Sequence, residues 1–222
     1  MSSKLNKQKY ITGLLIFLFL ISVKGYAQKD EDVLRIELSF GGNHAFTSGF
    51  AQIYASEDPK TEGRGFNLPT LNFGGQYMFS ETLGAKLDIG FSRIFSANDS
   101  PEFKINYTRI NAQVVYDYSR FIGFIPEEVT LLAHAGPGFS AVRPLGTIND
   151  NDQNYLNAIL GTQILYMFSR NTSVFFDASY IHGFSNPDTY APPSEGLGAF
   201  NGSMLTFTVG VSLSLSGCYF CN

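Results

Sequence analysis

Two cysteines close to the end of the chain have a spacing found in redox and metal sites. Cys218 and Cys221 are the only cysteines and form a Cys-x-x-Cys pair. A structural zinc site needs four ligands, and no histidine lies near this pair. A redox pair draws its low thiol pKa from a setting such as a helix N-terminus, whereas the alternation before Cys218 predicts a strand end. We therefore expect no metal and no cofactor here, and in an exported protein a small local disulfide.

A histidine, a serine and an aspartate in one segment raise the question of hydrolytic chemistry. His182, Ser185 and Asp188 lie in the stretch HGFSNPD. Activation of a serine needs these groups within hydrogen-bond reach of one another, which closeness in sequence does not supply. The acidic stretch 149–154 lacks the turning glycine and the distal glutamate of an EF-hand loop. We predict no catalytic residues and no metal site, and keep a lipid-modifying barrel enzyme as the lesser alternative.

The N-terminus predicts a signal peptide over residues 1–27. Lysines precede an apolar run of 13 residues, 11–23, and cleavage is expected between Ala27 and Gln28. A membrane-spanning helix needs about 20 apolar residues, which favours cleavage over retention as an anchor. Cleavage removes four lysines, so the mature chain has 11 basic and 19 acidic side chains and a net charge of −8. This charge makes nucleic acid a poor partner.

Past residue 32 the chain has the period-2 alternation of β-strands, interrupted by turn residues. The expected strands are 33–43, 67–79, 84–95, 104–118, 128–141, 154–168, 172–182 and 203–216. Such lengths suit strands that cross a bilayer at a tilt. Long connections alternate with mostly short ones, which is typical of outer-membrane barrels. We predict an all-β domain over residues 28–217, an eight-stranded antiparallel up-and-down transmembrane β-barrel with long extracellular loops and mostly short periplasmic turns, followed by a short periplasmic tail, 218–222.

The strands have one apolar and one polar face, and three features favour the apolar face outward. Aromatic residues gather at strand ends, small residues recur on the polar face, and the charges on that face nearly balance. The expected polar network of the lumen comprises Arg35, Glu37, Lys86, Asp88, Arg109, Asp117, His134 and Asp177. We predict that Asp88 approaches Arg109 and that Lys86 approaches Asp117, so that side chains fill the lumen. A secreted lipocalin-like carrier, with the apolar face inward, is the soluble alternative.

A short aromatic motif recurs at the ends of the second, fourth and sixth expected strands. The motif reads YMFS, YDYS and YMFS and supplies the residues Tyr77, Phe79, Tyr116, Tyr118, Tyr166 and Phe168. Aromatic rings concentrate at the headgroup level of membranes. We interpret these six residues as a periplasmic aromatic girdle, against the alternative of core aromatics in a soluble sheet.

The chain resembles the small OmpA-type, or porin-family, outer-membrane β-barrel proteins of Bacteroidota over about residues 28–216. The resemblance is carried by the YAQ signal end, by residues 71–93 and 131–140, and by the last strand. It implies location in the cell outer membrane, among lipid and lipopolysaccharide. It also implies a barrel-assembly signal, read by the insertion machinery, formed by Thr208, Gly210, Leu213 and Leu215. The expected role is structural, in envelope integrity, and the alternative is adhesion or binding of an extracellular partner through the long loops.

Overall fold

The computed structural model describes residues 33–46, 63–98, 102–145, 152–169, 171–185 and 202–215. Its strands are β1 (Val33–Ala45), β2 (Asn67–Met78), β3 (Leu83–Phe95), β4 (Lys104–Asp117), β5 (Val129–Leu145), β6 (Gln153–Ser169), β7 (Thr172–Gly183) and β8 (Met204–Ser214). The eight predicted strands are confirmed, most within a residue or two at each end. The largest difference is at β5, which continues past the expected end at residue 141 to Leu145.

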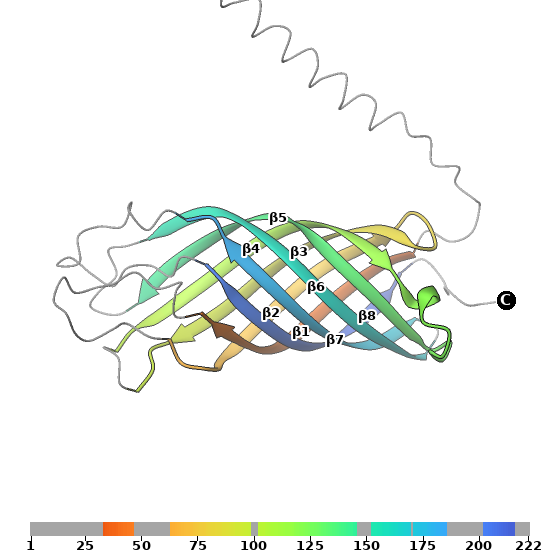
Figure 1. Ribbon diagram of the computed structural model, residues 1–222, viewed down its shortest axis with the longest axis horizontal. Coiled ribbons are helices and arrows are strands. Elements are labelled where there is room, and N and C mark those ends of the chain that lie inside the picture. Colours follow the sequence, from red (N-terminus) through yellow and green to blue (C-terminus); the bar gives the residue numbers. More distant parts are fainter. Residues whose placement is uncertain are drawn as a thin grey trace, which may run out of the picture. The chain divides into compact units, whose positions relative to one another are not determined.

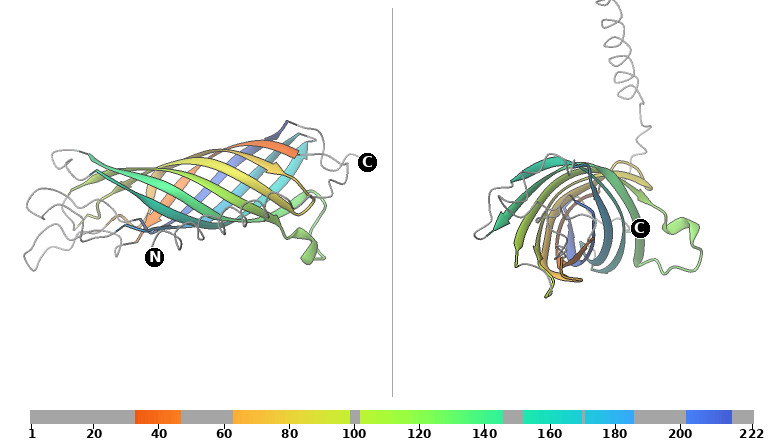
Figure 2. Two further views of the ribbon diagram at one scale, coloured as in Figure 1. Left: turned by 90° about the horizontal axis from the view of Figure 1, so that it is seen from above. Right: turned by 60° about the vertical axis from the view of Figure 1, so that its left-hand side comes forward.

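The eight strands form a closed antiparallel barrel in which each strand pairs with its neighbours in sequence and β8 pairs with β1 (Figures 1 and 2). If the paired residues are followed from Leu34 through all eight strands in turn, the path leads back to β1 at His44, ten residues further along the chain. For eight strands, this stagger gives a tilt within the roughly 35–45° typical of barrels, and an interior that side chains alone can fill. The predicted fold class is confirmed.

The connections between the strands distinguish the two rims of the barrel. The connections β1–β2, β3–β4, β5–β6 and β7–β8 lie at one rim, called here the long-connection rim. At the other rim, the short-turn rim, Ser80 Oγ accepts the N–H of Leu83 at 2.9 Å and thereby closes the β2–β3 turn. The β4–β5 connection at this rim contains a single 3-10 turn, η2 (Ser119–Phe121). Among the described residues, no helix has the length and apolar character needed to cross a membrane.

The two faces of the sheet are oriented as the sequence predicts. Large apolar side chains point away from the barrel and are exposed, including Leu38, Phe40, Phe73, Leu87, Val114, Leu156, Leu160 and Val209. Polar and charged side chains at the alternating positions point inward and are buried. A soluble carrier barrel needs the reverse arrangement, because water, unlike lipid, does not favour an exposed apolar surface.

Several sequence predictions fall outside the described residues. These are the signal peptide with its cleavage site at Ala27 and Gln28, the tail with Cys218 and Cys221, and Asp188. Most of the two longest connections, 47–62 and 186–201, also lies outside. The structure does not test these expectations, and they stay predictions from the sequence.

Candidate functional site in the barrel lumen

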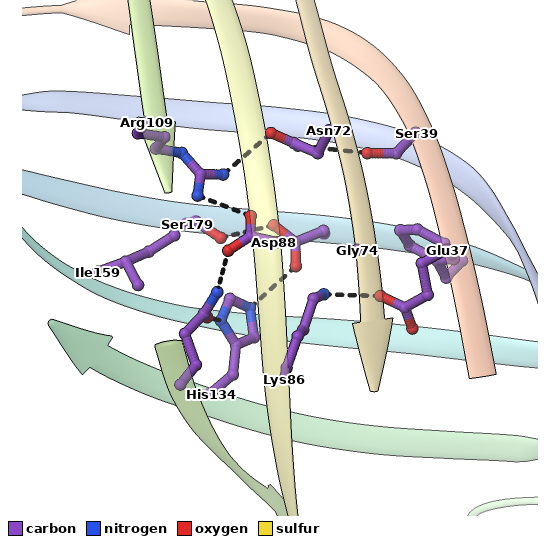
Figure 3. A pocket seen from close by; sticks show the side chains of 13 residues that line it. Glu37, Ser39, Asn72, Gly74, Lys86, Asp88, Arg109, His134, Ile159 and Ser179 are labelled. Atoms are coloured by element: carbon purple, nitrogen blue, oxygen red, sulfur yellow. Dashed lines mark hydrogen bonds and ion pairs between the residues drawn. The ribbon is translucent and has the colours of Figure 1, made fainter. Parts of the chain in front are cut away.

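The centre of the lumen is organised around an ion pair between Arg109 on β4 and Asp88 on β3. Arg109 Nη1 lies 2.7 Å from Asp88 Oδ2, and both residues are only 4% exposed. Arg109 also donates to the amide oxygens of Asn111 and Asn72, each at 2.9 Å. Asn72 in turn donates to Ser39 Oγ on β1, as Figure 3 shows. The predicted approach of Asp88 to Arg109 is confirmed, and hydrogen bonds from the guanidinium extend this pair to β2 and, through Asn72, to β1.

A second chain of hydrogen bonds runs from Asp88 to β7 through a histidine. Gln113 Nε2 donates to Asp88 Oδ1, which fixes the amide so that its oxygen faces His134 Nδ1 at 2.6 Å. The other ring nitrogen of His134 lies 2.9 Å from Asp177 Oδ2. Ser179 Oγ donates to the second oxygen of Asp177. His134 therefore lies between an amide oxygen on β4 and a carboxylate oxygen on β7, and it links the two strands across the lumen.

The sequence prediction for Lys86 is wrong. Lys86 Nζ pairs with Glu37 Oε2 at 2.7 Å, and Gln163 Nε2 donates to the other oxygen of Glu37 at 3.2 Å. Lys86 is paired across the ladder with Gln113, so Asp117 lies four residues further along β4, about 13 Å away at the rise of a strand.

Glycine explains how Lys86 reaches past β2 to Glu37 on β1. Glu37 pairs with Gly74 on β2, and Gly74 pairs with Asp88 on β3. Because Gly74 has no side chain, the ammonium group of Lys86 extends over β2 (Figure 3).

The two remaining predicted network residues are Asp117 and Arg35. The backbone N–H of Ser119 donates to Asp117 Oδ1 at 2.9 Å, so Asp117 helps to hold the β4–β5 connection. Arg35 is buried on β1.

Apolar side chains close the lumen on both sides of this polar network. Towards the long-connection rim lies a buried cluster of Ala45, Ile94, Phe103, Ile105, Tyr107, Val142, Tyr155, Ile159, Ile181 and Met204. Towards the short-turn rim lies a second, formed by Met78, Val115, Leu132, Leu165 and Phe175. The cavity that Figure 3 shows within the polar network has a volume of only about 20 Å³, which is room for about one water molecule.

These two apolar layers are not among the residues predicted for the lumen, although the alternation of the strands contains them. Ile94, Ile105 and Val115 occupy the same alternate positions as the polar lumen residues of their strands. Alternation therefore predicts which side chains point into the lumen. It does not predict whether those side chains are polar or apolar at a given position along the barrel.

The six residues interpreted as an aromatic girdle all lie at the short-turn rim. Five are exposed on the outward surface, with fractions from 39% to 60%. The sixth, Tyr118, is half-buried, and its hydroxyl lies 2.8 Å from Thr162 Oγ1.

A second aromatic group at the opposite rim was missed. It comprises His44, Phe46, Tyr180, His182 and Phe184, and each ring centroid lies within 6.3 Å of the next. The ring-bearing side chains at every second position in residues 180–184 are the pattern from which this group could have been predicted.

The arrangement around His182 differs from the hydrolytic group considered above. His182 Nδ1 lies 3.1 Å from the hydroxyl of Ser203 and 3.4 Å from that of Tyr180. Within the described residues, no acidic side chain bonds to His182 in a way that would orient the ring. Proton abstraction from a serine by a histidine is assisted by such a group.

The residues of the expected barrel-assembly signal lie on β8 or directly after it. Thr208 and Gly210 point into the barrel, while Leu213 and Leu215 are 47% and 57% exposed on the outward face. The threonine and glycine therefore face the lumen and the two leucines face outward, and the assembly signal itself stays a prediction.

No protein-family model and no curated protein matches this chain. Solved structures do match it. Neisserial surface protein A has 13% identity and a TM-score of 0.52, with 83% of this chain and 97% of that chain covered. A major outer membrane protein from Thermus thermophilus has 10% identity and a TM-score of 0.50, with 83% and 99% covered. The N-terminal β-barrel domain of Pseudomonas aeruginosa OprF has 11% identity and a TM-score of 0.47, with 82% and 97% covered.

The structures of the Neisserial and Thermus proteins show that this chain has the fold of small outer-membrane barrels. The chain's own surface agrees with that fold, because its apolar side chains face outward and its paired charges face inward. A closed barrel also leaves no strand edge unpaired, as a lipid environment requires. The protein is an outer-membrane β-barrel.

Proposed function

We propose that this protein is a structural component of the outer membrane that contributes to envelope integrity and conducts no solute. The observation that supports the proposal is the layered filling of the lumen, in which an ion-paired network lies between two apolar layers. Solute passage would require breaking the Asp88–Arg109 and Lys86–Glu37 pairs. Breaking a buried ion pair by losing one partner costs about 3–5 kcal/mol.

Two measurements test this proposal. Purified protein inserted in planar lipid bilayers is expected to give no steady conductance. A cell lacking the protein is expected to be more sensitive to detergent, and the wild-type chain should restore resistance. A variant lacking residues 47–62 keeps the strands and should restore resistance equally. A reproducible ohmic channel, or a deletion strain with unchanged detergent resistance, would contradict the structural role.

A second candidate function is recognition of an extracellular partner through the long connections. The observation that favours it is that the two longest connections begin side by side. Phe46, at the start of one, has its ring centroid 6.1 Å from that of Tyr180, close to the start of the other. The backbone N–H of Phe46 also donates to the carbonyl of Ser203, where that other connection ends. Loops held together on a rigid scaffold are common binding surfaces.

The deletion of residues 47–62 separates the two candidates. If recognition is the main role, this variant loses cell adherence or ligand binding while its detergent resistance is intact. Full detergent resistance together with unchanged adherence and ligand binding in this variant would favour the structural role instead.

We also propose which molecules the protein contacts and to which proteins it is related. The outward apolar surface is expected to contact membrane lipid and lipopolysaccharide, and β8 is expected to be read by the barrel-assembly machinery. The sequence patterns in residues 71–93 and 131–140 support kinship with the porin-family barrels of Bacteroidota. We assign no catalytic role, because the described residues give His182 hydroxyl partners and no orienting acid.

A further inference from the structure

The β4–β5 connection, residues 118–128, exposes two aromatic side chains at the short-turn rim. Phe124 and Phe121 are 88% and 76% exposed, the largest fractions among the large apolar side chains that the described part of the chain presents. Removing apolar surface from water is favourable by roughly 25 cal/mol per Å². Two neighbouring phenylalanines left open in this way indicate a surface that meets an apolar partner.

The connection is held in a defined shape by its own hydrogen bonds. The backbone N–H of Ile122 donates to the carbonyl of Ser119 at 3.0 Å, which closes the η2 turn. Ser119 Oγ accepts the N–H of Leu131 at 2.7 Å and thereby fastens the turn to β5. Phe121 ends the η2 turn, and Phe124 lies in the span closed by the hydrogen bond from the Ile125 N–H to the Ile122 carbonyl. Figure 1 shows the η2 turn at the end of the barrel.

The position of Phe121 identifies the partner. Its ring centroid lies 6.3 Å from that of Tyr116, an outward-facing girdle residue on β4 that is 39% exposed. The aromatic surface of the connection is thus continuous with the outward surface of the barrel, which faces lipid. Beside it, Arg120 Nη2 lies 2.5 Å from Glu81 Oε2 on the β2–β3 turn, and both side chains are exposed. Aromatic rings next to exposed charges match the boundary between acyl chains and headgroups.

We infer that the β4–β5 connection is a membrane anchor. Phe121 and Phe124 insert at the acyl–headgroup boundary of the leaflet that surrounds the short-turn rim, and Arg120 and Glu81 stay at the headgroup level. The ligand of this surface is phospholipid. The anchor adds a lipid contact beyond the strands themselves, and it accounts for a connection at this rim that is longer and more apolar than the β2–β3 and β6–β7 turns.

The absence of tryptophan from the chain makes a direct test possible. The variants Phe124→Trp and Phe121→Trp each place one indole in the connection. Tyr166→Trp, in the girdle, serves as the lipid-facing reference. Asn171→Trp, in the exposed β6–β7 turn of the same rim, serves as the aqueous reference. Each variant is reconstituted in phosphatidylcholine vesicles, and its folding is checked by the change in gel mobility on boiling.

The inference predicts that emission from both connection variants is shifted to the blue, as for Tyr166→Trp. Phosphatidylcholine brominated near the headgroup should quench them to a similar extent, and acrylamide should quench them severalfold less than Asn171→Trp. Two variants are used so that poor folding of one leaves the other informative. Emission and acrylamide quenching equal to those of Asn171→Trp, without quenching by brominated lipid, would overturn the inference. So would a blue shift that occurs only after a soluble protein extract is added, because the partner would then be a protein.

Discussion

The ion pair between Arg109 and Asp88 allows a quantitative test of the lumen network. The variant Arg109→Met keeps much of the side-chain volume but removes the guanidinium. Asp88 then loses its only cationic partner within 4 Å among the described residues and keeps Gln113 as a donor. Asn72 and Asn111 also lose the donor to their amide oxygens. Removal of one partner of a buried pair costs about 3–5 kcal/mol, because a buried charge is left uncompensated.

The second variant, Asp88→Asn, should cost less. Its buried guanidinium partner loses the carboxylate, but Arg109 keeps both asparagine acceptors, so the cost should lie near the lower end of the about 3–5 kcal/mol expected when one partner of a buried pair is removed. In the double variant neither charge remains buried without its partner. Its loss of stability should therefore be smaller than the sum of the two single losses, by about 1–3 kcal/mol.

Urea unfolding of the barrel in lipid vesicles, followed by gel mobility without boiling, measures these free energies. The exposed pair Lys104–Glu102 is the matched control, because its atoms are 3.7 Å apart and its side chains are 50% and 85% exposed. Lys104→Met and Glu102→Gln should show a coupling below about 0.5 kcal/mol. A coupling for Arg109 and Asp88 no larger than that of the control, with unchanged denaturant slopes, would refute the interpretation of the lumen as an energetically coupled network.

Two further predictions test the packing and the orientation of the barrel wall. Gly136→Ala should destabilise the barrel by about 1–3 kcal/mol, because its Cβ would collide with the Ala112 carbonyl and lie 2.7 Å from a second backbone atom. Gly75→Ala, whose Cβ would have its nearest neighbour at 3.9 Å, is the control and should unfold like the wild type in urea. Val209→Arg, on the outward face within β8, should cost about 2–4 kcal/mol in vesicles, and Phe168→Arg at the rim about 0–1 kcal/mol for its charge. Equal costs at the two positions would contradict the membrane placement of the strands.

The two buried ion pairs differ in how far apart their partners lie in the sheet. Asp88 and Arg109 lie on adjacent strands, one diagonal step apart in the ladder, since Asp88 pairs with Asn111. Their contact therefore follows once the hairpin register is known. The partner of Lys86 lies two strands away, and the contact depends on the missing side chain at Gly74 and on the closure of the barrel. No local pattern contains that information.

The sequence alone determined the number of strands, their approximate limits, the two faces of the sheet and the direction of the apolar face. The strands and their two faces are local properties, because side chains alternate with a period of two and turn residues interrupt the alternation. The direction of the apolar face followed from the aromatic residues at strand ends and from the small residues and nearly balanced charges of the polar face. Only the tertiary structure decided the partners and the layering within the lumen and the grouping at its rim: the placement of the histidine between Gln113 and Asp177, the two apolar layers, and the aromatic group around Tyr180. These depend on which strands meet across the interior, and this is set by the stagger of ten residues with which the barrel closes.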